Sequence, residues 1–433
     1  MNSTVRSRPR GSSAEKRGGK PVSASLGAIR RLAVVKQGLG RAHSRRASKD
    51  SILSLVRDLA YVQWDPVSIV APSHILSIWA RLGDFRLSEL NELLWEDRKL
   101  VQHWIPFAAI VLTEDYPIYG SFMHRYPESL SDGWGRQRAQ AREFLASHAS
   151  LQRKILRSLR DGPRTVDQFE DHARTRRHEG GWGSASDVSL MLGYLLMKGQ
   201  VMIAGHDGAQ SVWGLVRTEL PRWADKDVLS TMEAECSAAE RAIRALGTAT
   251  PREIELHYLR GCYLDLPGTL SRLFDRSLVR RVAVEEPAGQ SEERYVHDRD
   301  VSLLESLDSD FSERNVSLLP PFDNMVYSRQ RLGRLFGFDY VREQFLPKDK
   351  RRFGTYVLPI LWGDRLIGRI DARLDKDTAR LLIHAIYAEK GAPMDRAVAI
   401  AIAEKIAGLA NFLGARDVVY TSRVPARWRT AFR

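Results

Sequence analysis

The chain has 433 residues, too many for one ordinary hydrophobic core, and its length indicates about two to four domains. Hydrophobic residues make up 43% of it and charged residues 27%, which is typical of a globular protein and excludes a largely disordered chain. The formal net charge of +13 favours a polyanionic partner such as nucleic acid. An anionic membrane, or a basic protein that is merely soluble, is the alternative.

The two cysteines, Cys236 and Cys262, have neither the spacing nor the histidine partners of a zinc site. We therefore expect no metal, no cofactor and a reducing compartment, the cytoplasm. The apolar runs are too short to span a bilayer, so no membrane partner is expected. Residues 1–25 are rich in Arg, Lys, Ser and Gly and lack the apolar core of a secretion signal, which predicts a disordered basic arm. Such an arm either contacts phosphates or is dispensable.

The stretch Val62-Gln63-Trp64-Asp65-Pro66 combines an apolar and a polar pair. On an extended backbone Val62 and Trp64 share one face, and Gln63 and Asp65 share the other. Pro66 disfavours a helical conformation at Asp65. We expect the apolar pair to face a core and the polar pair to face outward. The alternative is an edge strand whose solvated face carries Gln and Asp.

The stretch follows an amphipathic helix that Ser48 can cap. Before it, residues 26–40 predict a basic helix. After it, short helical runs alternate with strand-like runs, and a winged-helix unit is the interpretation of 26–145. The apolar face of the capped helix is predicted to consist of Ile52, Leu55, Val56 and Leu59.

Residues 151–216 show the order of elements that a winged helix requires: two helices, a third helix and a hairpin. Thr165 to Gln168 reads as a capping box opening the second helix. The third helix is predicted from near Ser184 or Ser186 to Lys198, as the helix that reads DNA. A basic segment precedes it, and we expect DNA contacts from this segment and the helix start: Arg174, Arg176, Arg177 and Ser186. Winged helices also bind proteins, but the basic segment favours DNA.

A similar plan recurs over residues 228–296, where Thr250-Pro251-Arg252-Glu253 predicts another capping box. From residue 318 the pattern favours short antiparallel strands, with a final helix from about residue 392 to 414 and a last strand. This part is basic and is interpreted as a DNA clamp or as a scaffold with a solvated face. Its candidate DNA contacts are Arg351, Arg352 and Arg369.

Several stretches together resemble the winged-helix DNA glycosylases of the AlkZ/YcaQ type, which unhook interstrand crosslinks. They are residues 62–74, 318–324, 334–340, 356–359 and 363–369, and the resemblance covers 26–425. The catalytic pattern of the family is Gln, any residue, then Gln or Asp, which Gln63 and Asp65 match. His74 lies beside a family histidine, which implies contact with a phosphate or base; the alternative is a structural histidine. Pro106 stands where the family often has His, which bears on substrate choice and activity.

The resemblance implies an α+β fold with tandem winged-helix domains forming a concave DNA channel, followed by a small antiparallel β-domain. The predicted domains are 1–25 (basic arm), 26–145, 146–222 and 223–310 (winged helices) and 311–433 (β-rich). It further implies a monomeric, nucleoid-associated, monofunctional DNA glycosylase. Its partner would be double-stranded DNA carrying alkylated or crosslinked purines, in general repair or in self-resistance.

An N7-alkylated purine loses its positive charge when its glycosidic bond breaks, so it leaves without a general acid. Asp65 would stabilise the sugar cation and orient or deprotonate a water that Gln63 holds. The alternative function is that of a non-enzymatic winged-helix DNA-binding protein, either a regulator or a damage-binding factor.

Overall fold

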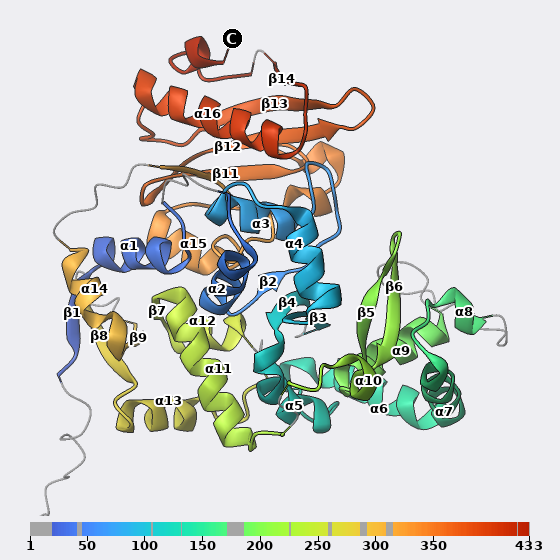
Figure 1. Ribbon diagram of the computed structural model, residues 1–433. Helices are drawn as coiled ribbons and strands as arrows, with labels where there is room; N and C mark the ends of the chain where they lie inside the picture. Colours follow the sequence, from blue (N-terminus) through green and yellow to red (C-terminus); the bar gives the residue numbers. More distant parts are fainter. Residues whose placement is uncertain are drawn as a thin grey trace, which may run out of the picture.

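A computed structural model shows how the chain folds (Figure 1). It describes residues 20–40, 46–104, 107–130, 132–170, 186–224, 227–258, 262–285, 292–308, 315–421 and 423–432. In the described part of the chain, no helix combines the length and apolarity that a bilayer crossing requires. A mixed α/β body carries a β-rich layer at one end and a lobe of helices and a hairpin at its side.

The first unit is built around a three-stranded antiparallel sheet of order β2-β4-β3. Its elements are α2 (Lys49–Leu59), β2 (Val62–Gln63), α3 (Ser73–Leu82), α4 (Leu87–Asn91), β3 (Leu100–Trp104) and β4 (Ala108–Leu112). Ser48 caps α2 by accepting a hydrogen bond from the Ser51 amide, because the first amides of a helix lack partners within it. The predicted apolar face of α2 is buried, which confirms its helical period.

The same order of helix, strand, helix, helix and two strands occurs in a third unit, whose strands have the order β7-β9-β8. Its elements are α11 (Thr231–Leu246), β7 (Thr248–Ala249), α12 (Pro251–His257), α13 (Leu266–Asp275), β8 (Val279–Glu285) and β9 (Arg294–His297). The predicted capping box is confirmed, since the Thr250 amide donates to Glu253 at 3.0 Å and the Glu253 amide donates to Thr250 at 3.2 Å.

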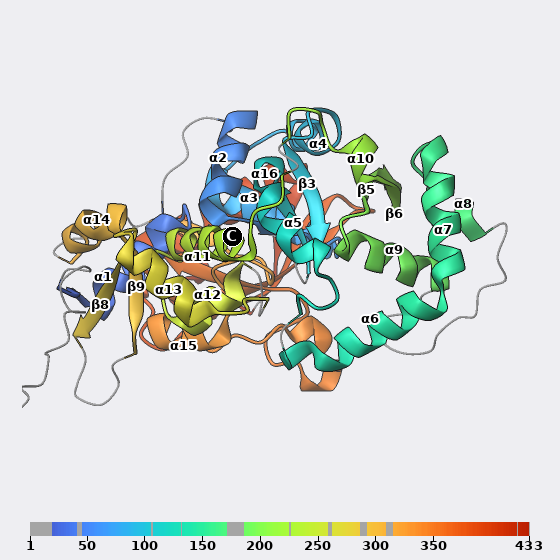
Figure 2. The ribbon, with the colours of Figure 1, turned by 90° about the horizontal axis from the view of Figure 1, so that it is seen from below.

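The second unit lies between them in sequence and forms the side lobe (Figure 2). Its elements are α6 (Gly135–Ser147), α7 (Ala149–Ser158), α8 (Asp167–Glu170), α9 (Asp187–Met197), β5 (Val201–Asp207), β6 (Gln210–Leu215) and α10 (Val216–Glu219). A single bridge between Arg164 and Trp213 stands where the other units have a first strand. α5 (Tyr116–His124) links the lobe to the first unit.

The predicted boundary between a basic arm and a first domain at residue 25 is wrong. Val22–Ser25 form β1, which pairs in parallel with β8 of the third unit. The following helix α1 (Leu26–Lys36) buries Ile29 and Leu32 with Val282 and Val296. A helical period shows which face of a helix is apolar but not which distant sheet will cover that face. The packing of β1 and α1 on the third unit therefore cannot be predicted from the sequence pattern.

The C-terminal part is a five-stranded sheet of order β10-β11-β12-β13-β14. Its elements are β10 (Val316–Leu318), β11 (Val357–Trp362), β12 (Arg365–Asp375), β13 (Arg380–Ala388) and β14 (Asp417–Tyr420), with α15 (Arg329–Phe336) and α16 (Arg396–Phe412). The preceding helix α14 (Val301–Ser306) packs instead with α1 and β1. The sheet is mixed and not purely antiparallel as expected, because α16 carries the chain back so that β14 runs parallel to β13.

The C-terminal sheet and the first unit share one hydrophobic core, so residues 311–433 do not pack as a separate body. Ile52 and Trp79 from the first unit lie in the same buried cluster as Ile360, Ile383 and Ile406. This shared core sets the β-rich layer directly against the segment that follows β2.

Candidate active site

The Gln63–Asp65 motif lies where β2 leaves its sheet. Gln63 pairs with Ala109 of β4, and the Trp64 amide donates to the Ala108 carbonyl at 2.8 Å. The chain then turns at Asp65. Its carboxylate Oδ1 accepts a hydrogen bond from the Val67 amide at 2.7 Å. The Asp65 carbonyl accepts one from the Ser73 amide at 3.2 Å. One local bond therefore fixes the carboxylate, and the other fixes the backbone of the turn.

The expectation that Asp65 faces outward is wrong. Asp65 is only 8% exposed, whereas Trp64, which was expected in the core, is partly exposed. The C-terminal layer covers the turn, since the Leu374 amide donates to the Ile69 carbonyl at 2.9 Å and the Tyr356 hydroxyl donates to the Ala71 carbonyl at 3.3 Å. Strand alternation predicts two faces, but not that a distant domain covers one of them.

Gln63 is half-buried, and its Oε1 is a buried acceptor that has no hydrogen-bond partner among the described residues. Buried polar atoms in folded proteins almost always have a partner. This amide oxygen, two residues before a fixed carboxylate, is therefore a candidate acceptor for a water molecule or a substrate donor.

The charge of Asp65 is set by opposing influences. Burial raises the pKa of the Asp65 carboxyl, while the Val67 amide and the positive charge of Arg342 oppose that rise. The Arg342 guanidinium packs over the rings of Phe322 at 5.3 Å and Tyr327 at 5.5 Å. The site thus holds a desolvated carboxylate close to a cation that is itself fixed by aromatic rings.

Three rings stack beside the motif. Trp64 lies between His74, with ring centroids 4.1 Å apart, and His206 of β5, 5.2 Å apart. His206 Nε2 is also within 2.8 Å of Gln102 Oε1 on β3. A residue of the second unit therefore completes the surroundings of a motif in the first unit.

His74 does not face a DNA phosphate or base as predicted, because its ring is 5% exposed and lies beneath Trp64. Burial lowers the pKa of His74 to about 4, so the ring is neutral at pH 7. The structural-histidine alternative describes this geometry: His74 supports the Trp64 indole.

Acid is expected to destabilise the fold through His74 and His103, since burial lowers the pKa of each to about 4. Between pH 6.5 and 4 the unfolded chain binds these protons and the folded chain does not, so stability falls as pH falls through this window. The cost at pH 5 is about 2 kcal/mol for each histidine. The drop in melting temperature from pH 7 to pH 5 should be smaller for His103→Gln than for wild type. An equal drop in the two proteins would contradict this.

Three of the other predicted DNA contacts cannot be compared with the structure, because Arg174, Arg176 and Arg177 lie outside the described residues. Pro106, the departure from the family pattern, lies outside them too. Ser186 caps α9 by accepting a hydrogen bond from the Ser189 amide at 3.2 Å, which confirms the helix start but leaves DNA contact a prediction.

The predicted DNA contacts of the C-terminal part differ in how much of each side chain is exposed. Arg352 is exposed and stacks on Phe353, whereas Arg351 donates to the Leu346 carbonyl and to Thr355, so their DNA contacts stay predictions. Arg369 is 5% exposed and pairs with Glu389 at 2.6 Å. The prediction that it binds DNA is therefore wrong, because an inward strand position and a local carboxylate hold its charge inside.

Sequence reasoning missed Arg342 and His206 as members of the site. Arg342 follows the family-like stretch 334–340 by two residues, and that proximity was the available signal. His206 carries no local signal, since its contact with Trp64 depends on how the second unit docks against the first.

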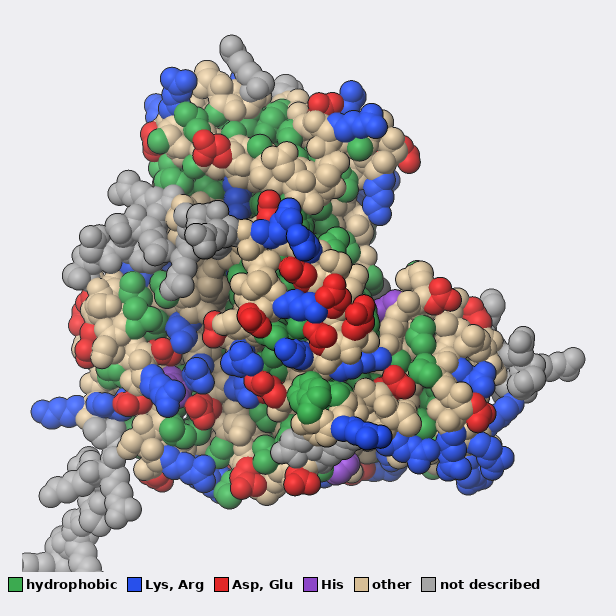
Figure 3. Space-filling view, in the orientation of Figure 1, with side chains coloured by type: hydrophobic (Ala, Val, Ile, Leu, Met, Phe, Trp, Pro, Cys, Tyr) green, Lys and Arg blue, Asp and Glu red, His purple; other side chains and the backbone are tan. Residues whose placement is uncertain are grey.

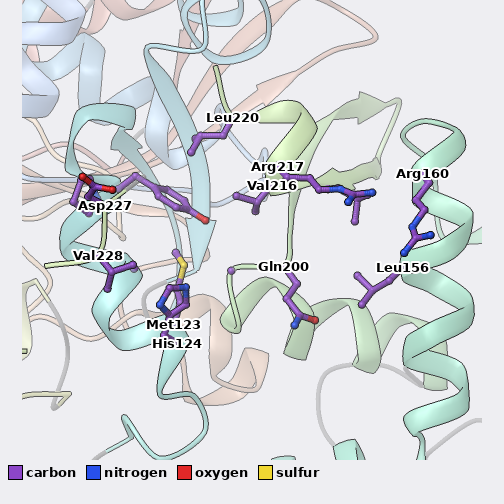
Figure 4. Close-up of a pocket in the computed structure, with 15 residues that line it drawn as sticks. Met123, His124, Leu156, Arg160, Gln200, Val216, Arg217, Leu220, Asp227 and Val228 are labelled. Atoms are coloured by element: carbon purple, nitrogen blue, oxygen red, sulfur yellow. The ribbon is translucent and has the colours of Figure 1, made fainter. Parts of the chain in front are cut away.

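Two cavities border the second unit. The first, of about 420 Å³, lies between α5 and the lobe, and Figure 4 shows Arg160 and Arg217 extending toward one side of it, away from Asp227. The second, of about 410 Å³, has aromatic walls that include Trp104 and Tyr126. Among the described residues no three His, Cys, Asp or Glu side chains gather as a metal site requires.

Comparison with known proteins agrees with this architecture. The family model for DNA glycosylase AlkZ-like proteins matches residues 56–412. Among solved structures, the Streptomyces sahachiroi DNA glycosylase AlkZ superposes with a TM-score of 0.63 at 16% sequence identity, covering 93% of this chain and 100% of that chain. The structural match shows a shared fold, and the family match spans most of the chain. The chain therefore belongs to the AlkZ-like DNA glycosylase family.

Proposed function

We propose that this chain is a monofunctional DNA glycosylase that hydrolyses the N-glycosidic bond of N7-alkylated purines, and that Asp65 and Gln63 carry the reaction. One observation carries the proposal. The Val67 amide fixes the Asp65 carboxylate, and two residues earlier Gln63 Oε1 is buried without a partner, at positions that match the catalytic pattern of the family.

The reaction needs no general acid. As the bond between sugar C1′ and purine N9 breaks, its electron pair passes into the purine and cancels the charge of the alkylated ring. The sugar carbon becomes cationic, and the nearby Asp65 carboxylate stabilises it. A water held by Gln63 Oε1 attacks C1′ and gives its proton to Asp65. The products are the free base and an intact strand with an abasic sugar.

Arg342 is expected to set the working pH of this site. Its charge holds the pKa of Asp65 lower than burial alone would, so Arg342→Gln should raise that pKa and shift the acidic limb of kcat/KM to higher pH. Activity should then fall more at pH 6 than at pH 8. Arg329→Gln, which removes an exposed arginine paired with Asp339, is the control. If Arg342→Gln lowers kcat/KM equally at pH 6 and pH 8, Arg342 acts in DNA binding and not on the pKa of Asp65.

We infer that the repeated helix-strand-helix-helix-strand-strand order forms tandem winged helices that hold the duplex. The net charge of +13 supports a DNA partner. Figure 3 shows Lys and Arg side chains gathered over the outer side of the second unit. Exposed residues there include Arg153, Lys154, Arg157 and Arg160, on α7 and just after it. An open basic surface, rather than a deep pocket for the whole lesion, is compatible with a base tethered to both strands, so crosslinks fall within the proposal.

The proposal is tested with a duplex carrying one N7-methylguanine. The expected result is release of free N7-methylguanine, with strand breakage at that position only after heat or alkali. Breakage without heat would show a lyase and contradict the monofunctional assignment. Tight binding without base release would support the non-enzymatic alternative.

A further inference from the structure

We propose that the aromatic cavity between β3, α6 and α9 binds a neutral planar heteroaromatic ring during lesion recognition. This inference rests on the proposed function, since the ring would come from damaged DNA. It has two sources: a nucleobase displaced at the lesion, or a ring system carried by the adduct itself. The cavity has a volume of about 410 Å³, within the usual range for ligand sites.

The walls have the chemistry that a flat ring requires. Aromatic side chains from five segments line the cavity: Trp104, Tyr126, Trp134, Tyr194 and Trp213. Trp104 is 45% exposed, which is unusual for a large apolar side chain that touches a cavity. Aromatic faces bind bases without regard to their sequence because every base has a π-face.

One polar atom in the wall has no partner. Trp213 Nε1 is buried and makes no hydrogen bond among the described residues. A buried indole N–H usually finds an acceptor. Ring nitrogens and carbonyl oxygens of nucleobases and related heterocycles are such acceptors, whereas an alkyl chain offers none. An unpartnered donor on a wall residue therefore favours a heteroaromatic ring over a purely aliphatic occupant.

The first sheet connects a wall residue of the cavity with the proposed catalytic motif. Trp104 pairs with Ala108, and the Ala108 carbonyl accepts the hydrogen bond of the Trp64 amide. Trp64 and Trp104 are thus two strand spacings apart, about 10 Å. The β5–β6 hairpin joins the two places again, since His206 stacks on Trp64 and Trp213 lines the cavity. A ring bound at Trp104 would lie within a few nucleotides of the bond at Asp65.

The other cavity that borders the second unit suits this role less well. Its lining includes two rings, Tyr116 and His124, and the arginines Arg160 and Arg217 extend at one side of it (Figure 4). The two cavities therefore differ in chemistry, and the one lined by Trp104, Trp134 and Trp213 offers more faces on which a neutral ring can stack.

The test measures Kd for three duplexes that cannot be cleaved because a 2′-fluoro sugar stabilises the glycosidic bond. They carry N7-methylguanine, N7-(quinolinylmethyl)guanine or undamaged guanine. Trp104→Ala should weaken binding of a lesion duplex about tenfold, which is about 1.4 kcal/mol, and leave the undamaged duplex unchanged. Loss with both lesions identifies a displaced base as the occupant. Weaker binding of the quinolinylmethyl lesion alone identifies the adduct ring as the occupant.

Trp223→Ala is the matched control, because Trp223 is 56% exposed and lines neither cavity. If Trp104→Ala and Trp223→Ala bind all three duplexes equally, the proposal is overturned. Kd values do not depend on cleavage, so absent base release would defeat the proposed function and leave this comparison intact.

A second test fills the cavity instead of enlarging it, with one variant in the cavity and one control elsewhere. A Cβ on Gly193 of α9 meets no atom within 4 Å, and Gly193 lines the cavity, so Gly193→Leu should occupy it and weaken lesion binding as Trp104→Ala does. Gly333→Leu is the control, since Gly333 is also helical and open but lies on α15. Equal lesion binding by both variants would overturn the proposal.

Discussion

Replacing Asp65 with asparagine is expected to slow base release from an N7-methylguanine duplex by roughly 10²–10⁴-fold. Asparagine keeps the size of the side chain and still accepts the hydrogen bond of the Val67 amide. It cannot stabilise the sugar cation or take the proton of water. The measurement is single-turnover release of the free base, with the duplex and enzyme concentrations above Kd.

Stability measurements separate this effect from unfolding. Burial raises the pKa of Asp65, so the folded protein bears a cost for keeping the carboxyl ionised at neutral pH. The melting temperature of Asp65→Asn should accordingly equal or exceed that of wild type. Asp371→Asn is the control. Asp371 is another carboxyl whose pKa burial raises, and it accepts the Thr355 amide at 3.1 Å, outside the proposed catalytic group. Equal rates for wild type and Asp65→Asn would end the catalytic assignment.

Replacing Arg81 with methionine is expected to destabilise the protein by about 3–5 kcal/mol, because it leaves a buried carboxylate without its cation. The side chains of Arg81 and Asp323 are 1% and 0% exposed, and their two contacts are 2.5 and 2.8 Å long. Arg81 Nε also donates to the Gln37 carbonyl at 2.7 Å. This one guanidinium therefore ties α3 to the end of α1 and to the C-terminal layer.

Thermal and urea unfolding measure this loss. Arg57→Met is the control, because the exposed pair of Arg57 and Glu114 should contribute no more than about 1 kcal/mol. The double variant Arg81→Met/Asp323→Leu should recover part of the loss, since it removes the orphaned charge as well. If Arg81→Met is no less stable than Arg57→Met, the hydrogen bonds of Arg81 do not hold the layers together.

The 318–324 stretch explains why this network bears on the site. The Asn324 side-chain amide donates to the Tyr61 carbonyl at 2.8 Å, just before the Gln63 strand. Phe322 packs under Arg342, whose charge acts on Asp65. The 318–324 stretch, which resembles a family motif, thus supports the Gln63–Asp65 turn from a distant part of the chain.

Local features were predictable because they are encoded locally. The caps at Ser48, Ser186 and Thr250 are satisfied as their sequences indicate, and α2 buries the face that its period predicts. The Gln63–Asp65 motif was found by its residue types and its likeness to a family pattern. These signals lie within a few residues of one another, so no tertiary contact is needed to recognise them.

The remaining features depend on contacts between distant segments. Asp65 is buried because the C-terminal layer covers its turn, and β1 joins a sheet whose other strands lie more than two hundred residues away. Arg369 faces inward because Glu389 neutralises it there. Neither composition nor periodicity reveals these distant partners. For that reason a basic residue such as Arg369, which stabilises the fold, is predicted from the sequence as a DNA contact.

The most direct test of the central claim follows the oxygen of water in the reaction of an N7-methylguanine duplex. In ¹⁸O-labelled water, the account predicts free N7-methylguanine and one ¹⁸O atom at C1′ of an abasic sugar in an unbroken strand. Both products should disappear with Asp65→Asn. Bound but unchanged DNA, or an unaltered yield of both products from Asp65→Asn, would contradict it.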